Sequence, residues 1–261
     1  YVRVHVAPLT VGRSGKAGSG IAPGARVRKE ANGDVWLEGV PMVDQGARGY
    51  CAAAVVTRVL QFYGNTEIDQ HQVAQLAQST SEGGTSPSVM IENLRRMATK
   101  LDFVVRPLQT LDIKGFMRLI DDYNRTARRA DRQVLDLNEF VNRQNALEVE
   151  AVYEAMAPEL LRQTRSKDLG GQRRFVADIN KALAKGWPVA WGCMIGMFPE
   201  TPPVGQGVGG HMRLIIGYNA KTSEVLYTDT WGPRHELKRL PLADAWAMTT
   251  DTLLLEPRGK R

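Results

Sequence analysis

The best candidate for a nucleophile in this chain is Cys51. It follows the turn-like segment GARGY and opens a stretch whose apolar residues recur at helical spacing, so we expect a helix over 51–63 that begins at the cysteine. A helix N-terminus favours negative charge and can lower a thiol pKa, and only the thiolate is a nucleophile. The second cysteine, Cys193, stands in the apolar, strand-like segment 187–196 and is predicted to be a buried core thiol.

A general base should accompany the thiol, and His211 is the best candidate among the four histidines. It opens a strand-like segment, and Asp229 stands in the next one. An antiparallel hairpin would bring the two side chains opposite or nearly opposite each other. The aspartate would then orient the imidazole and stabilise its charged form. His235 is a secondary candidate for the base, and His5 and His71 are predicted to be surface residues.

Further residues near these positions suit acyl transfer. Gln45 lies six residues before Cys51, where its amide could join the Cys51 backbone N–H in stabilising an oxyanion. Trp231 lies two residues after Asp229, on the same strand face, where an indole would shield the His–Asp hydrogen bond from water. Glycines before His211 would let a substrate backbone approach closely. The residues expected to contact substrate or shield the site are Tyr50, Gly209, Gly210 and Trp231.

The elements that must position these residues change in kind along the chain. Helices predominate first and strands afterwards, which favours an α+β class over alternating βαβ units. Helices are predicted at about 51–63, 67–78, 87–100, 112–130, 138–165 and 172–185. Strands are predicted at 1–6, 187–196, 211–219, 224–231 and 251–257, and a tight hairpin at Asn32-Gly33.

Composition sets outer limits on function. The 261 residues are 43% hydrophobic and 24% charged, as in ordinary globular proteins, and the net charge is +6. The arginines at 125–132 are surrounded by aspartates at 121, 122, 131 and 136, so nucleic-acid binding is not expected. No apolar run approaches the ~20 residues of a membrane span. Two cysteines without CxxC or HExxH patterns favour neither a disulfide framework nor a metal site.

Taken together, Gln45, Cys51, His211 and the run Asp229-Thr230-Trp231-Gly232 resemble the papain-like cysteine peptidases. The blocks VPMVDQGARGYCAAA and GGHMRLIIGYN, with VLYTDTWG, are most similar to the bacterial bacteriocin-processing branch, which acts on double-glycine leaders. The resemblance covers about 40–64 and 187–257. Tyr50 and Ala52 depart from papain, which has a small serine and a tryptophan there, and the sequence lacks the cassette and membrane spans of many leader peptidases.

The resemblance implies an α+β, papain-like fold, with a helical part carrying the cysteine and an antiparallel sheet carrying the histidine and aspartate. It implies a hydrolase that cleaves a peptide or protein substrate through a Cys-His-Asp triad, a thioester and a glutamine-assisted oxyanion hole, without cofactor or metal. A papain-fold amidase or acyltransferase and a catalytically silent peptide-binding module remain alternatives. The compartment is unknown, although the bacterial branch favours an extracytoplasmic or secreted setting.

We expect one peptidase domain over 36–257, and three segments lie outside its resemblance or its bounds. Residues 1–35 would form an N-terminal hairpin and linker, and residues 258–261 a basic tail. Residues 109–170 would be a helical insertion that covers the cleft or docks a protein partner.

Overall fold

The structure is a computed structural model, and it describes most of the chain between residues 26 and 258. The described residues are 26–46, 49–77, 92, 95, 96, 98 and 103–258. The predicted strand at 1–6 and most of the predicted helix at 87–100 lie outside them, as does most of the basic tail.

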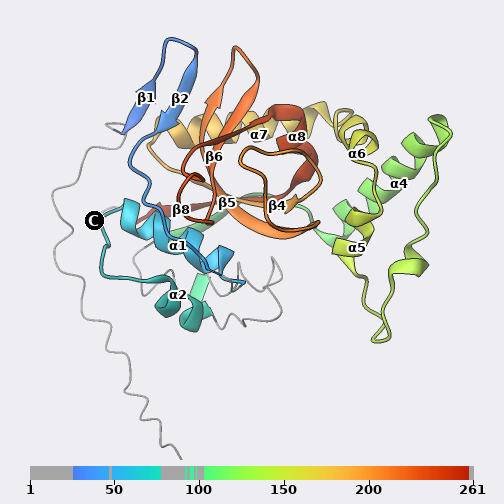
Figure 1. The fold of residues 1–261 in the computed structure, drawn as a ribbon, viewed down its shortest axis with the longest axis horizontal. Coiled ribbons are helices and arrows are strands. Elements are labelled where there is room, and N and C mark those ends of the chain that lie inside the picture. The colour runs from blue at the N-terminus through green and yellow to red at the C-terminus, as the bar shows by residue number, and fades with distance from the viewer. Residues whose placement is uncertain are drawn as a thin grey trace, which may run out of the picture.

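The fold is α+β, as predicted, and is built on an eight-stranded sheet whose strand pairs are all antiparallel (Figure 1). The order is β1-β2-β5-β4-β8-β3, with β6 pairing to β5 and β7 to β6. The strands are β1 (Val27–Lys29), β2 (Asp34–Leu37), β3 (Phe103–Thr110), β4 (Val189–Ile195), β5 (Gly209–Asn219), β6 (Glu224–Thr228), β7 (Lys238–Pro241) and β8 (Thr249–Pro257).

Four of these strands confirm the predictions from sequence, and two were missed. The predicted segments 187–196 and 224–231 contain β4 and β6, and the segments 211–219 and 251–257 contain most of β5 and β8. Sequence reasoning missed β7, which is short, and β3. In β3 the pairing with β8 shifts register between Pro107 and Gln109. A proline cannot donate to a strand ladder, and the irregularity accommodates it, which is why the segment did not read as a strand.

The predicted hairpin at Asn32-Gly33 is present between β1 and β2. Gly33 has a φ of +101°, a conformation that favours glycine, and its N–H donates to the Glu30 carbonyl at 3.0 Å. The hairpin is part of the main sheet, because β2 pairs with β5. The domain boundary expected at residue 35 therefore falls inside β2.

The helices lie on different sides of the sheet (Figure 1). In that view α1 and α2 lie at one end, α4, α5 and α6 at the other, and α7 behind the strands. The helices are α1 (Cys51–Phe62), α2 (Gln70–Ala77), α4 (Ile113–Arg129), the 3-10 helix η1 (Leu137–Phe140), α5 (Val149–Glu154), α6 (Pro158–Arg165), α7 (Leu169–Ala184) and α8 (Leu242–Met248).

The continuous helix predicted at 138–165 is wrong. The chain instead forms η1, an isolated bridge between Val141 and Leu147, and then α5 and α6. The Asn142 side chain accepts hydrogen bonds from two backbone N–H groups of the intervening turn, and Asn145 has a φ of 58°. Asparagine stabilises such turns, and Pro158 can only begin a new helix because its ring clashes inside one.

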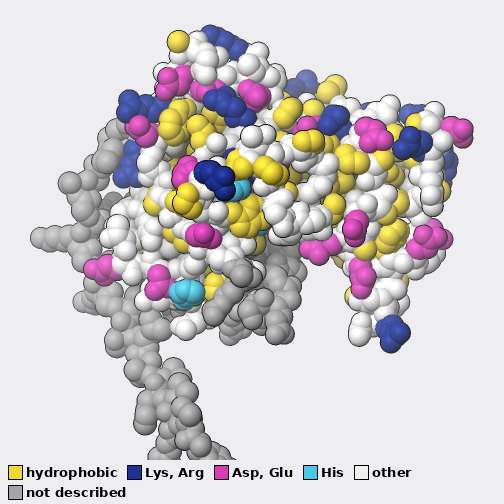
Figure 2. Space-filling view, in the orientation of Figure 1, with side chains coloured by type: hydrophobic (Ala, Val, Ile, Leu, Met, Phe, Trp, Pro, Cys, Tyr) yellow, Lys and Arg dark blue, Asp and Glu magenta, His cyan; other side chains and the backbone are white. Residues whose placement is uncertain are grey.

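The surface carries charges of both signs. Lys and Arg side chains are interspersed with Asp and Glu on the face seen in Figure 2, rather than gathered in one patch. Within the described part of the chain, no helix combines the length and apolar character that a membrane crossing requires. The described residues also hold no group of three or more His, Cys, Asp or Glu side chains placed to bind a metal ion.

Candidate active site

Cys51 is the first residue of α1, and its thiol faces the beginning of β5. Burial is the largest influence on this thiol and would raise its pKa. This effect of burial is more than offset by groups that stabilise the thiolate. They are the side chain of His211, through a hydrogen bond and its charge, and the backbone N–H groups of Met212 and Ala52. The pKa of Cys51 is therefore lowered from its ordinary value, which favours the thiolate.

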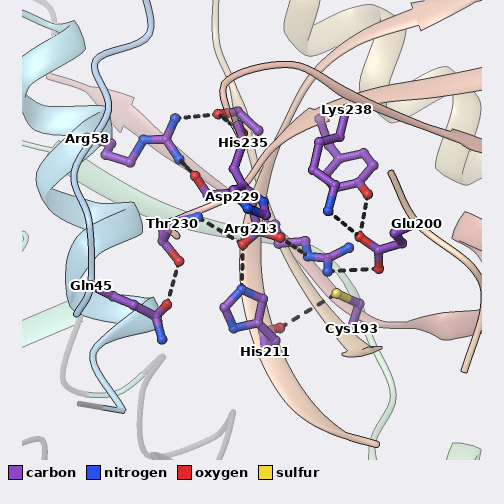
Figure 3. A network of polar contacts seen from close by, with 12 residues as sticks. Gln45, Arg58, Cys193, Glu200, His211, Arg213, Asp229, Thr230, His235 and Lys238 are labelled. Atoms are coloured by element: carbon purple, nitrogen blue, oxygen red, sulfur yellow. Dashed lines mark hydrogen bonds and ion pairs between the residues drawn. The ribbon is translucent and has the colours of Figure 1, made fainter. Parts of the chain in front are cut away.

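His211 connects the thiol to a carboxylate. Its Nε2 lies 2.6 Å from Asp229 Oδ1, and the two side chains are 2% and 0% exposed (Figure 3). Because Nε2 is engaged with the aspartate, Nδ1 is the ring nitrogen left to serve Cys51. Burial would lower the pKa of His211, but Asp229 and Cys51 raise it above its ordinary value. The ring is thus favoured as an imidazolium between two anions.

The hairpin brings His211 and Asp229 together by a diagonal contact. The β5–β6 ladder pairs Leu214 with Thr228 after a register shift between Ile215 and Gly217. Continuing that register by one residue places Asp229 across from residue 213, and His211 is two residues further along the same face. The meeting predicted from the sequence is therefore observed, although the two residues are not directly opposite.

Trp231 covers one face of the His211 ring. The two rings are stacked, with centroids 4.5 Å apart and an interplanar angle of 9°. The loop that carries the indole is fixed at both ends, because Asp229 N donates to the His235 carbonyl at 2.9 Å and Gly232 packs closely on Asp44. Gly232 has a φ of 74°, a conformation that favours glycine, and a Cβ there would lie 2.6 Å from Asp44 Oδ2.

Gln45 is buried and is held by Thr230 at two points. Its backbone N–H donates to the Thr230 carbonyl at 2.8 Å, and Thr230 Oγ1 donates to Gln45 Oε1 at 2.5 Å. Since the amide oxygen is occupied, the NH₂ group is left as the donor available to a ligand. The position of Gln45 was predicted from sequence, whereas the orienting role of Thr230 was not.

Arg58 links the helix of the nucleophile to the aspartate loop, and sequence reasoning missed it. It lies two helical turns after Cys51 and is fully buried. Its guanidinium donates to Pro41 O and Asp229 O, each at 2.6 Å, and to Thr228 Oγ1 at 2.5 Å. Burial lowers its pKa to about 10, partly offset by Asp229. The available signal was an arginine within the apolar 51–63 helix.

A second buried arginine, Arg213, contacts the far side of the aspartate. Its Nε lies 2.9 Å from Asp229 Oδ2, and its Nη2 donates to Glu200 Oε1 at 2.9 Å. Glu200 Oε2 in turn lies 2.9 Å from Lys238 Nζ and accepts from the Tyr227 hydroxyl at 2.6 Å. Burial would raise the pKa of Asp229, but the bond from His211 and the charge of Arg213 hold it well below its usual range.

The remaining predicted residues lie around this centre. The Tyr50 ring meets His71 edge-on at 5.8 Å. Gly209 is buried in β5, and the Gly210 N–H donates to Glu150 Oε1 of α5 at 2.9 Å. His235, the secondary candidate for the base, packs edge-on against Trp231 at 5.9 Å.

These features define an α+β protein in which a helix-start cysteine contacts a buried histidine–aspartate pair. The sequence matches the Peptidase_C39 like family over residues 111–253, more than half of the chain, and the chain belongs to that family. The family is the bacteriocin-processing peptidase-like branch that the resemblance indicated. The match contains His211 and Asp229, begins after Cys51, and includes helices that the resemblance left out. No curated protein sequence matches the chain.

Proposed function

We propose that the chain is a papain-like cysteine peptidase that cleaves peptide bonds with Cys51, His211 and Asp229. The observation that supports this most is a continuous line of hydrogen bonds from the thiol to the imidazole and on to the carboxylate. The lowered pKa of the thiol and the raised pKa of the imidazole are what an ion pair of thiolate and imidazolium requires.

In the first half-reaction the Cys51 thiolate attacks the carbonyl carbon of the substrate, and the carbonyl oxygen becomes an oxyanion. Two donors can receive it: the Cys51 N–H, which has no intrahelical acceptor in the first turn of α1, and the free NH₂ of Gln45. The C–N bond then breaks while His211 Nδ1 gives its proton to the leaving amine. A thioester on Cys51 and a neutral His211 remain.

In the second half-reaction a water molecule attacks the thioester. Neutral His211 takes one proton of the water, the C–S bond breaks, and the substrate leaves as a carboxylic acid. The thiolate and imidazolium are regenerated. Asp229 keeps its negative charge throughout and stabilises the imidazolium, while the stacked Trp231 keeps water from the His–Asp hydrogen bond.

The helical segment with α4, α5 and α6 borders this site. Its one hydrogen bond with the strand of the base, among the described residues, runs from the Gly210 N–H to Glu150 Oε1. That contact supports the proposal that the segment lines the substrate path, as a lid or as a docking surface for a protein substrate. We further propose that the domain includes β1, since β2 is a strand of the main sheet.

The test is cleavage of a mixed peptide library, read by mass spectrometry, with wild-type protein, Cys51→Ala and Cys193→Ala. We expect new peptide ends with wild type and Cys193→Ala and none with Cys51→Ala. Adding glycinamide separates the alternatives, because an acyltransferase would give amide products in preference to acids. Continued cleavage by Cys51→Ala would overturn the proposal. Rapid labelling of Cys51 without any cleavage or acyl-enzyme would favour a peptide-binding module.

A further inference from the structure

We propose that Arg213 and Glu200 are positioning residues, which hold the Asp229 carboxylate in the orientation and charge state that the Cys51–His211 pair needs. The proposal rests on the proposed function of that pair. The inference comes from a buried chain of alternating charges that runs away from the site (Figure 3). Its members in order are His211, Asp229, Arg213, Glu200 and Lys238.

Every link of this chain is short and dry. Three ion pairs join Asp229 to Arg213, Arg213 to Glu200, and Glu200 to Lys238, each with an N–O distance of 2.9 Å. All four side chains are 0% exposed. Lys238 Nζ also donates to the Pro202 carbonyl at 2.9 Å, which closes the far end. Isolated buried charges are strongly unfavourable, so each member depends on its neighbours for compensation.

The chain specifies a carboxylate at residue 229. Asp229 Oδ1 lies 2.6 Å from His211 Nε2, and Oδ2 lies 2.9 Å from Arg213 Nε as an ion pair without hydrogen-bond geometry. Both partners carry N–H groups and positive charge, so the residue between them must present an oxygen to each. An asparagine would turn its NH₂ toward one of the two donors, which leaves buried N–H groups facing each other. The presence of Arg213 therefore explains why an aspartate suits this site.

Arg213 also contacts the aromatic cover of the histidine. Its guanidinium carbon lies 6.0 Å from the Trp231 ring centroid and 4.9 Å from that of Tyr227. Trp231 is stacked on His211, so the arginine touches two of the groups that fix the imidazole. Arg213 has no exposed surface, and it cannot contact substrate directly.

The titratable or charged groups around the His211–Asp229 pair come from several elements. They are Cys51 and Arg58 of α1, Cys193 of β4, Glu200, Arg213 of β5, Tyr227 of β6, His235, and Lys238 of β7. Removing the cation next to Asp229 makes the carboxylate easier to protonate, so the imidazolium loses its partner at a higher pH. Removing Glu200 leaves Arg213 uncompensated, and the extra positive charge disfavours the imidazolium.

The experiment compares full-length Arg213→Met and Glu200→Gln with wild type. Labelling of Cys51 by iodoacetamide, resolved from Cys193 by peptide mass spectrometry, gives the acid limb of thiolate formation. NMR titration of the His211 imidazole gives its midpoint. We expect Arg213→Met to move the acid limb upward by about one pH unit, and Glu200→Gln to move the imidazole midpoint downward. A folded Asp229→Asn variant should also label more slowly at Cys51 than wild type.

A matched control is Arg239→Met, which removes an arginine paired with Asp34 in the same sheet. It should lower the melting temperature and leave both midpoints unchanged. A purely structural role for Arg213 and Glu200 would give this same pattern in their variants, and that result would overturn the proposal. Glu200→Gln is nearly isosteric and decides the matter if Arg213→Met fails to fold. A wild-type Cys51 that labels as an ordinary thiol would instead refute the proposed function.

Discussion

The start of α1 and the middle of β4 each hold one free cysteine, and both thiols contact the same histidine. Cys51 interacts with the side chain of His211, whereas Cys193 Sγ lies 3.8 Å from the His211 carbonyl oxygen. Burial raises the pKa of Cys193 far above its ordinary value, while the pKa of Cys51 is lowered. Two thiols that contact the same residue thus have pKa values shifted in opposite directions.

The two thiol pKa values differ because the two sulfurs have different hydrogen-bond partners, more than because of a difference in burial. Cys51 Sγ receives hydrogen bonds from an imidazole and from backbone N–H groups, all of which favour an anion. Cys193 is a donor to a carbonyl oxygen, which favours the neutral thiol. Burial opposes ionisation at both sites, and only at Cys51 do the surrounding donors overcome it.

The largest expected effect is in alkylation of the two thiols. At pH 6 we expect iodoacetamide to label Cys51 about 100-fold faster than Cys193, because only the thiolate reacts. Peptide mass spectrometry of time-resolved samples gives both rates in one experiment. Cys193→Ala should leave the fast phase in place and Cys51→Ala should remove it. Equal, slow labelling of both cysteines would contradict the comparison.

The surroundings of Cys51 could largely be predicted from the sequence. A helix starting at Cys51 follows from an apolar period that needs no tertiary information, and the β5–β6 hairpin follows from two β-rich segments joined by a short turn. Gln45, Cys51, His211 and Asp229 could therefore be selected from spacing and chemistry alone. The exact pairing could not, because the register shift between Ile215 and Gly217 leaves no recognisable signal.

The next largest effect concerns how α1 is fixed to the aspartate loop. Arg58→Met should remove three hydrogen bonds to buried acceptors and reduce the free energy of unfolding by about 4 kcal/mol. Labelling of Cys51 at pH 6 should slow at the same time, because the thiol is no longer held against His211. Urea unfolding and alkylation rates measure the two effects.

Arg26→Met is the matched control for this helix. Arg26 donates one hydrogen bond, at 2.5 Å, to the Phe62 carbonyl at the other end of α1. Its loss should reduce the free energy of unfolding by about 1 kcal/mol without changing the alkylation rate. If both variants slowed alkylation alike, Arg58 would have no particular role in placing the thiol.

The buried arginines were beyond the reach of sequence reasoning for a physical reason. Arg58 and Arg213 are charged residues inside apolar segments, and a sequence gives no indication of which distant groups compensate them. Their partners come from a loop, from a neighbouring strand and from residue 229. A charge within a strongly periodic apolar segment does, however, indicate a buried partner somewhere, since an unpaired one would destabilise the fold.

A smaller effect, on the pH dependence of stability, tests the apolar surroundings of Cys193. Asp251 on β8 pairs with Gly192, next to Cys193, and its Oδ1 has no hydrogen-bond partner among the described residues. Burial raises its pKa to about 6. A raised folded pKa stabilises the protein below the unfolded value of about 4, and this stabilisation is lost as the pH rises through 6. We expect this carboxyl to contribute a loss of about 2 kcal/mol between pH 4 and pH 8.

Asp251→Asn should remove this pH dependence, since an amide does not ionise. The free energy of unfolding, measured by urea at several pH values, should therefore fall less steeply with pH in the variant than in wild type. Asp121→Asn, at an exposed position on α4, is the control and should follow wild type. A wild-type curve that stays flat from pH 4 to pH 8 would show that the surroundings of Cys193 do not penalise charge.

The smallest effect concerns the open edge of β5 beside Cys51. The backbone of Met212 bonds to the Cys51 thiol and that of Gly210 to Glu150, so both N–H groups face the same edge. Opposite β4, that edge pairs with β6 only from Leu214 onward. Two residues along a strand span about 7 Å, which puts the Glu150 carboxylate within one substrate residue or two of the thiol.

A carboxylate in that place should favour substrates with a Lys or Arg near the scissile bond. Glu150→Gln keeps the bond to Gly210 and removes the charge, so kcat/KM should fall by about threefold to tenfold for cationic peptides and hardly change for neutral ones. The difference should shrink at high salt because the carboxylate is exposed. Glu154→Gln, on the same helix, is the control. An equal loss for cationic and neutral peptides would mean that Glu150 shapes the edge without reading charge.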